Sequence, residues 1–226
     1  MTNQNPSWAD LRIAADTAPK KIVRRLQMLS VYGAEYDKFC DAIEDALDFA
    51  VKKAVEHKNI INPNSSISGR MDENQITAYL SMALLGMCFD IAHSKNVGGN
   101  CDITITGSHE MLWLGEAKIF TSYPKALGGY QQLCDRYATG LGSQNRGGFL
   151  IYHFRKNSGG VLENWKEHLN DARPGIAVES TEHAHIFKST ESHAGTGLDY
   201  HVRHMIVPLF HSPTDSAAKP AKASRK

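Results

Sequence analysis

The sequence predicts an α/β protein in which helices flank a mixed central β-sheet. Three observations carry this prediction. Apolar residues recur at helical spacing in the N-terminal part, a two-strand hairpin follows a glycine-rich break, and helices then alternate with strands. A chain of 226 residues is long enough for one domain that buries most of its apolar surface without disulfides. No apolar run approaches the roughly 18 residues that a membrane-spanning helix needs, so no membrane association is expected.

The N-terminal part is predicted to contain three amphipathic helices. In the first, Ile22, Leu26 and Leu29 fall on one face. In the third, Ile76 begins a strongly periodic apolar face. A stretch rich in Asn, Ser and Pro separates the second helix from the third and is predicted to be a loop. The predicted helices span residues 20–32, 35–57 and 72–93, and the loop spans residues 59–69.

The chain changes character after Gly98-Gly99-Asn100. Apolar and polar residues then alternate as in a strand, with Ile103 and Ile105 on one face, and a second strand completes a hairpin. The segment that starts at Gly147 is continuously apolar, as expected for a strand buried on both faces. The predicted strands span residues 101–106, 111–120, 147–154, 183–187 and 200–209, and the predicted helices between them span residues 123–139 and 161–169.

One domain is expected to span residues 19–211, with a helical layer (19–58) ahead of an α/β core (72–211). Residues 1–18 are polar and are expected to be loose, and residues 212–226 are predicted to be a disordered basic tail. The formal net charge of the whole chain is only +1. Because the tail is itself positively charged, the rest of the chain is close to neutral and has no overall positive field. Nucleic acid would therefore have to be bound by local basic patches.

The cysteines are spaced too far apart for a zinc-finger or redox pair. They are expected to be reduced and mostly buried thiols, as in a cytoplasmic protein. The polar N-terminus lacks the apolar core of a secretory signal, which agrees with a cytoplasmic location. The cysteines are Cys40, Cys88, Cys101 and Cys134.

Three acidic residues and one lysine are the strongest candidates for chemistry. Glu116 and Lys118 are two residues apart in a predicted strand, so both project from one face, about 7 Å apart. The hairpin can bring Asp102 alongside Glu116. Two neighbouring carboxylates repel each other unless a cation lies between them, and Mg²⁺ would meet that need. Glu73 shares the face of the buried stripe of its helix, where a carboxylate needs a partner.

Each of these residues also has an ordinary structural interpretation. A Glu-x-Lys pattern occurs by chance in many sequences, and Asp102 could simply end the turn after the glycines. Glu73 could offset the positive end of its helix, with Asp72 as the N-cap and Gln75 completing a capping box. The order of the elements favours the chemical interpretation: an acid on a helix, a glycine-rich break, an acid at a strand, and an apolar strand that ends in Glu-Ala-Lys.

That order resembles the PD-(D/E)xK nuclease superfamily, whose members share a restriction-endonuclease-like core. The family pattern is a helix-borne Glu, a G-x-x-D element that starts a strand, and a hydrophobic strand that ends in (D/E)-x-K. Gly99-Asn100-Cys101-Asp102 matches the second element, and Leu112-Trp113-Leu114-Gly115-Glu116-Ala117-Lys118 matches the third. The resemblance covers residues 72–137, under a third of the chain, and the proline of the family name is absent before Asp102.

The resemblance implies a Mg²⁺-dependent or Mn²⁺-dependent deoxyribonuclease of the restriction or anti-phage defence type. It implies that Asp102, Glu116 and the Ala117 carbonyl bind the metal, that Glu73 acts through metal-bound water, and that Lys118 positions the attacking water. Some branches carry a Gln and a Tyr four residues apart on the next helix. Here that helix carries Gln131, Gln132 and Tyr137 as candidate substrate-binding residues, and the last two are five residues apart.

Further expectations concern partners. A basic stripe on the first helix is either a solvated face or a contact to the DNA backbone. Two active sites are needed to break both strands, so a homodimer is expected, and the near-neutral body favours recruitment to DNA by a protein partner. The stripe consists of Lys20, Lys21, Arg24 and Arg25.

Two other functions stay open at this point. The same fold could be a catalytically silent subunit that binds nucleic acid or supports an assembly. Alternatively, the late histidines could bind zinc, because two of them share a face of one predicted strand. These histidines are His183, His185, His201 and His204.

Overall fold

The computed structural model describes residues 18–32, 35–63, 69–92 and 95–213. Within these ranges, a seven-stranded sheet runs in the order β1-β4-β5-β6-β9-β8-β7. The central strands β5, β6 and β9 are parallel to one another, and the strands on both sides pair antiparallel. The strands are β1 (Asp90–Ala92), β4 (Ile103–Thr106), β5 (Leu112–Ile119), β6 (Arg146–His153), β7 (Ala177–Ser180), β8 (Ile186–Ser192) and β9 (Asp199–Pro208). A separate two-stranded pair joins β2 (Lys95–Asn96) to β3 (Asn100–Cys101).

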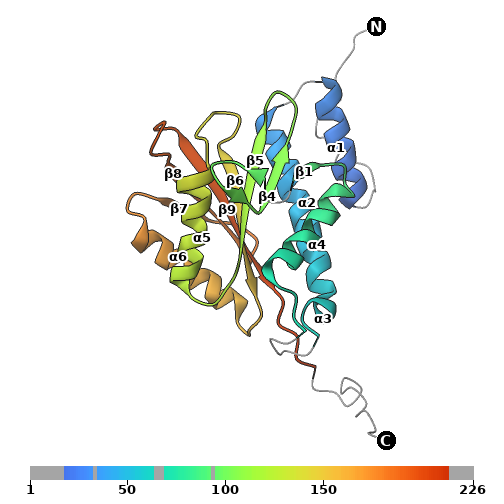
Figure 1. Cartoon of the computed structure of the whole chain (residues 1–226), viewed down its shortest axis with the longest axis vertical. Coiled ribbons are helices and arrows are strands. Elements are labelled where there is room, and N and C mark those ends of the chain that lie inside the picture. Colours follow the sequence, from blue (N-terminus) through green and yellow to red (C-terminus); the bar gives the residue numbers. More distant parts are fainter. Residues whose placement is uncertain (1–17, 33–34, 64–68, 93–94, 214–226) are drawn as a thin grey trace, which may run out of the picture.

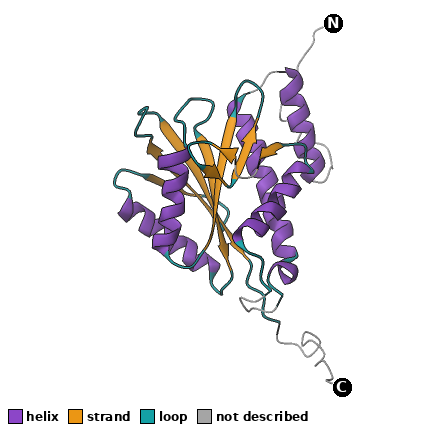
Figure 2. Ribbon diagram, viewed as in Figure 1, coloured by secondary structure: helices purple, strands orange, loops and turns teal. Residues whose placement is uncertain are grey.

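Helices cover the sheet from both sides (Figures 1 and 2). The N-terminal helices lie on one side, and the helices from the middle of the chain lie on the other. The first group is α1 (Ala18–Tyr32), α2 (Tyr36–Glu56), α3 (Lys58–Ile61) and α4 (Glu73–Leu85). The second group is α5 (Tyr123–Gln131), which continues into the π-helical segment η2 (Gln132–Tyr137), and α6 (Ser158–Ala172). The mixed α/β class predicted from the sequence is therefore confirmed.

Each side of the sheet has its own apolar core. Trp113 and Ala117 of β5 pack with the N-terminal helices, whereas Leu114 packs with α5 and α6. The two-residue period of the strand produces this division. The core on the first side also contains residues of α1, α2 and α4, so the predicted helical layer and the α/β core share one hydrophobic interior.

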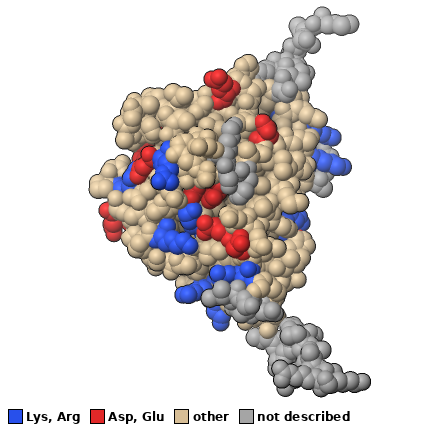
Figure 3. All heavy atoms as spheres, viewed as in Figure 1, with Lys and Arg blue, Asp and Glu red and all other residues tan. Residues whose placement is uncertain are grey.

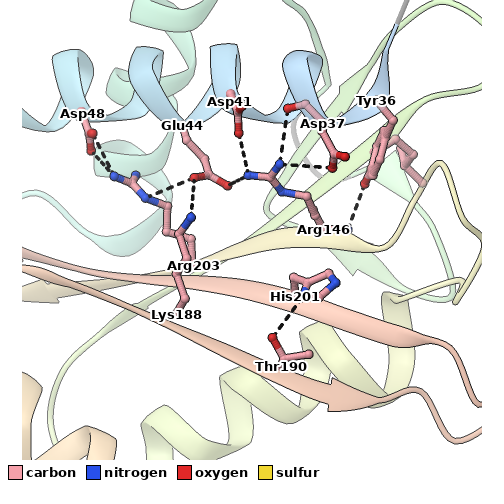
Figure 4. Close-up of polar contacts among 11 residues, drawn as sticks. Tyr36, Asp37, Asp41, Glu44, Asp48, Arg146, Lys188, Thr190, His201 and Arg203 are labelled. Carbon is pink, nitrogen blue, oxygen red and sulfur yellow. Dashed lines mark hydrogen bonds and ion pairs between the residues drawn. The ribbon is translucent and has the colours of Figure 1, made fainter. Parts of the chain in front are cut away.

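An acidic stripe on α2 also faces the sheet (Figure 4). Glu44 accepts a hydrogen bond from Arg146 Nη2 at 2.6 Å and lies 3.6 Å from Arg203 Nε. Arg203 also donates to both carboxylate oxygens of Asp48 at 2.8 Å. Arg203 is only 8 % exposed, and an arginine buried among carboxylates holds a helix in a fixed position on a sheet.

The helix predicted at residues 72–93 corresponds to α4, which is shorter than predicted. It ends at Leu85 instead of residue 93, and Cys88 follows with a φ of 68°. Residues 90–92 form strand β1, in which Ile91 lies opposite Ile105 of β4. The prediction was wrong because the same apolar residues that continue a helical stripe can also pair at the edge of a sheet.

The last third of the chain shows two further differences. Residues 183–185 form a turn, so the strand predicted at 183–187 begins only at Ile186 and extends to Ser192. Strand β7, which is short and largely exposed, was not predicted.

The loop predicted at 59–69 includes the short helix α3. The predicted loose N-terminal segment and basic tail lie outside the described residues, apart from Ala18, Ser212 and Pro213.

Candidate active site

The first turn of α4 directs Glu73 toward strand β5. Asp72 caps the helix by accepting a hydrogen bond from the Gln75 backbone N–H, and the Gln75 side chain accepts one from the Asp72 N–H. This is the predicted capping box. Since Asp72 and Gln75 satisfy the helix end, the Glu73 carboxylate is available elsewhere, and it accepts the Ile119 backbone N–H at 2.7 Å.

Asp102 lies at the break between β3 and β4. Ile103 of β4 pairs with Gly115 of β5, so the next step along the hairpin brings Asp102 alongside Glu116, as predicted. The Asp102 carboxylate accepts the Ala117 backbone N–H at 2.9 Å. The N–H and C=O of a strand residue point to the same side, so the Ala117 carbonyl is directed toward this edge of β5 as well.

The Lys118 ammonium group lies among the three carboxylates. Its Nζ contacts Glu116 Oε1 directly and lies 3.5 Å from Glu73 Oε1 and 3.8 Å from Asp102 Oδ2. The structure therefore brings together all four residues that the sequence analysis selected, from α4, the β3–β4 break and β5. Glu116 is buried, with only 2 % of its surface exposed.

Burial and charge shift the proton affinities of the site. Burial raises the pKa of Glu116 to about 7, and the Asp102 carboxylate adds to this effect, while Lys118 opposes it. Burial alone would lower the pKa of Lys118, but the carboxylates of Glu116, Asp102 and Glu73 raise it above its ordinary value. Three carboxylates face one ammonium group, so the four side chains carry a net negative charge when all of them are ionised.

The donor set fits a hard divalent cation. Asp102, Glu116 and the Ala117 carbonyl offer only oxygen ligands, and Mg²⁺ usually takes one or two protein carboxylates together with water. Within the described ranges, Glu116 Oε2 is buried without a hydrogen-bond partner, so one carboxylate oxygen has unused capacity. Among the same residues no three acidic, His or Cys side chains are arranged as a complete metal-binding group. The ammonium of Lys118 occupies the centre of the cluster instead.

The helix that follows β5 holds the predicted Gln and Tyr at an unusual spacing. α5 passes into the π-helical segment η2, whose hydrogen bonds run over five residues, so Gln132 and Tyr137 lie closer to one face than they would in an α-helix. Tyr137 donates to the Asn100 carbonyl at 3.0 Å, beside Asp102. Burial raises the pKa of Tyr137, and the Glu116 carboxylate adds to this effect.

The three candidates on this helix differ in position. Gln131 is exposed, whereas Gln132 is half-buried, and its Oε1 lacks a partner among the described residues. The glycine-rich break makes room for Tyr137. A Cβ on Gly99 would lie 2.7 Å from the Tyr137 ring, and Gly98 has a φ of 65°. Gly99 of the G-x-x-D element and the preceding Gly98 therefore allow the approach of this helix to the strand.

Two residues of the site were not found from the sequence. Tyr152 of β6 contacts Thr77 Oγ1 at 2.9 Å, and Thr77 donates to the Glu73 carbonyl, so a buried tyrosine fixes the first turn of α4. Gly129 of α5 lies against Lys118, where a Cβ would come within 2.6 Å of Lys118 Cγ. The Gly128-Gly129 pair in a predicted helix is a visible signal of this close approach, although the sequence alone does not identify the neighbour.

The basic stripe on α1 does not join the site. Arg25 forms an ion pair with Asp45 of α2, and α1 packs against α2 at the outer side of the molecule (Figure 1). Lys20 and Arg24 are exposed, and Lys21 is half-buried. The stripe therefore lies away from the four-residue cluster. It stays a candidate contact to a DNA backbone, but not to the phosphate at the cluster itself.

The late histidines do not form one ligand set. His201 and His204 are three residues apart in β9 and project from opposite faces of the sheet. His204 is fully buried, and its two ring nitrogens contact Trp165 Nε1 and Ser189 Oγ. His183 and His185 lie in a turn. The structure therefore does not bring these four histidines together at one position.

The site thus rests on Glu73, Asp102, Glu116 and Lys118, with Tyr137, Tyr152 and Gly129 beside them.

None of the helices in the described part of the chain has the length and apolar character required to span a membrane. Comparison of the chain with protein-family models, with curated proteins and with solved structures finds no match in any of the three.

Proposed function

We propose that the protein is a metal-dependent deoxyribonuclease that hydrolyses phosphodiester bonds. The observation that supports this most strongly is the convergence of Asp102, Glu116 and Lys118 with Glu73 at the edge of β5. Paired carboxylates beside a lysine suit phosphodiester hydrolysis because they can hold a cation next to a group that binds a nucleophile or an anionic oxygen. The resemblance to the PD-(D/E)xK pattern supports the same assignment.

Each residue has a role in this proposal. Asp102, Glu116 and the Ala117 carbonyl would hold Mg²⁺ or Mn²⁺, which supplies Lewis-acid chemistry at the phosphate when bound. Lys118 orients water or binds a phosphate oxygen through its Nζ. Glu73 accepts the Ile119 N–H and thereby holds the start of α4 against β5. Tyr152 supports that position through Thr77.

The biological setting is proposed from the resemblance alone. Single-chain nucleases of this pattern often act in restriction and anti-phage defence, so we propose that class for this protein and expect it to work in the cytoplasm. A homodimer would present two active sites, one to each of two DNA strands. A sedimentation mass equal to that of the monomer at micromolar concentration would contradict the dimer.

The activity is tested with the purified full-length chain on DNA in the presence of Mg²⁺, Mn²⁺ or EDTA. Cleavage by the wild type with either metal, with none in EDTA and none by Glu116→Ala, is the expected result. Manganese titration by calorimetry gives an independent readout, with one binding event that Asp102→Ala removes. Equal cleavage by the wild type and Glu116→Ala would show that the activity belongs to a contaminant and would overturn the assignment.

A catalytically silent subunit of the same fold is the second candidate. One observation favours it: Lys118 already neutralises part of the carboxylate cluster, so the fold needs no metal to hold these groups together. This alternative would be supported if the protein binds DNA but neither cleaves it with Mg²⁺ or Mn²⁺ nor binds manganese in the calorimetric titration.

Gly129→Ala is expected to lower the cleavage rate about tenfold. The new Cβ would lie 2.6 Å from Lys118 Cγ and 3.0 Å from the Phe149 ring, so the lysine must move away from its position among the carboxylates. A displacement of about 1 Å can cost that much or more. Gly128→Ala is the matched control because nothing lies within 4 Å of its Cβ. The measurement is the initial cleavage rate with both variants, and equal rates would contradict the positioning role of Gly129.

A further inference from the structure

Aromatic rings gather at the ends of β5 and β6, next to the four-residue cluster. The ring centroid of Phe120 lies 5.1 Å from that of Tyr123 and 5.7 Å from that of His153. The Tyr123 ring lies 5.6 Å from His168 of α6. Phe120 and Tyr123 are both partly exposed. The Phe120 ring meets the Tyr123 and His153 rings edge to face, and together they form a partly exposed aromatic surface against which a further flat ring can be placed.

This aromatic group is close to the cluster along the chain and in space. Phe120 follows Lys118 by two residues, and its backbone N–H continues the pairing with β6 by donating to the Tyr152 carbonyl at 2.9 Å. The two side chains therefore project from the same face of the strand, about 7 Å apart. A phosphate held at the cluster would have its attached nucleoside within reach of Phe120.

Basic side chains border the same edge of the sheet. The loops after β6 and β9 are neighbours, because the Leu209 N–H donates to the His153 carbonyl at 2.8 Å. Arg70 stacks on the Phe154 ring at 4.2 Å, and Arg155 and Lys156 are exposed. In the view of Figure 3, Lys and Arg side chains gather on the lower part of the molecule, beside Asp and Glu side chains. Ligands of open α/β sheets commonly bind beyond the carboxyl ends of the parallel strands, which is the edge occupied here.

We propose that this edge, with Phe120 and Tyr123 as its aromatic members and Arg155 and Lys156 as its basic members, binds a DNA strand whose bases are unpaired. Bases inside a duplex are stacked on one another and cannot lie on protein rings, whereas an unpaired base offers its flat face to them. The basic members contact the phosphates. This inference rests on the proposed function, since it names the form of DNA that reaches the cluster.

The test measures binding of the full-length chain to a single-stranded oligonucleotide that carries 2-aminopurine, with Ca²⁺ in place of Mg²⁺. Stacking quenches 2-aminopurine fluorescence, and anisotropy gives the dissociation constant. Phe120→Ala and Tyr123→Ala are each expected to weaken binding about tenfold and to reduce the quenching. Tyr123→Phe should retain both because it keeps the ring. Phe49→Ala is the matched control, since Phe49 is also a partly exposed phenylalanine but lies on α2.

The outcomes separate this inference from the proposed function. Arg155→Gln combined with Lys156→Gln changes only exposed residues, and is expected to weaken binding and its salt dependence without altering the fold. Blunt duplex that binds as tightly as the single strand, or unchanged binding by both aromatic variants, would overturn the inference. Base stacking without any metal-dependent cleavage would retain the inference and remove the proposed nuclease.

Discussion

Lys118→Ala is expected to lower the rate of metal-dependent DNA cleavage by roughly 10²–10⁴-fold, the range found when a group that handles a proton or water in the transition state is removed. The ammonium forms ion pairs with all three carboxylates, at 3.5 Å from Glu73 and 3.8 Å from Asp102 and in direct contact with Glu116. The measurement is the single-turnover cleavage rate at saturating enzyme.

Two controls distinguish lost chemistry from lost folding. Lys188→Ala removes an exposed lysine whose partner, Glu44, belongs to the α2 interface at 3.8 Å, and it should cleave at the wild-type rate. Lys118→Ala also leaves three acids without their cation, so its thermal midpoint in EDTA should fall below that of the wild type and should recover more on addition of Mg²⁺. A Lys118→Ala protein that cleaves within threefold of the wild type would contradict the assigned role.

The candidate site was predictable from the sequence because its geometry follows from strand periodicity. A two-residue period places Glu116 and Lys118 on one face, and a hairpin with a short turn places Asp102 next to them. The capping box at Asp72 and Gln75 could also be predicted, since it depends on residues three positions apart. Local rules of this kind need no knowledge of the tertiary structure.

The remaining features depend on contacts between distant residues. Nothing near Tyr152 in the sequence indicates that its hydroxyl meets Thr77, because the two residues belong to elements that meet only in the folded protein. The helix that stops at Leu85 shows the same limit, since Ile91 could continue the helical stripe or pair with Ile105. The acidic stripe of α2 has a helical period, but its partners Arg146 and Arg203 lie far along the chain.

Glu116→Gln is expected to change how stability depends on pH in the metal-free protein. The pKa of Glu116 is raised from 4.5 to about 7, chiefly by burial, so the folded state keeps a proton that the unfolded state has lost. The contribution of this group therefore stabilises the fold below pH 4.5 and is lost as the pH rises to about 7. A shift of this size corresponds to about 3 kcal/mol in the free energy of unfolding.

The total pH dependence contains an opposing contribution, so the comparison with the variant is essential. Burial lowers the pKa of His204 from 6.5 to about 3, and the stability from this group is lost as the pH falls below 6.5. The measurement is the free energy of unfolding by urea in EDTA at several pH values, for the wild type and for Glu116→Gln. The contribution of His204 is the same in both proteins and cancels when one free energy is subtracted from the other. That difference should move by about 3 kcal/mol in favour of the glutamine variant between pH 4.5 and pH 8. Glu182→Gln, an exposed site, should show no such trend, and a flat difference for Glu116→Gln would mean that the carboxylate is not held in a desolvated site.

Cleavage should respond in the opposite direction, rising with pH through about 7, because only the ionised Glu116 can bind a cation.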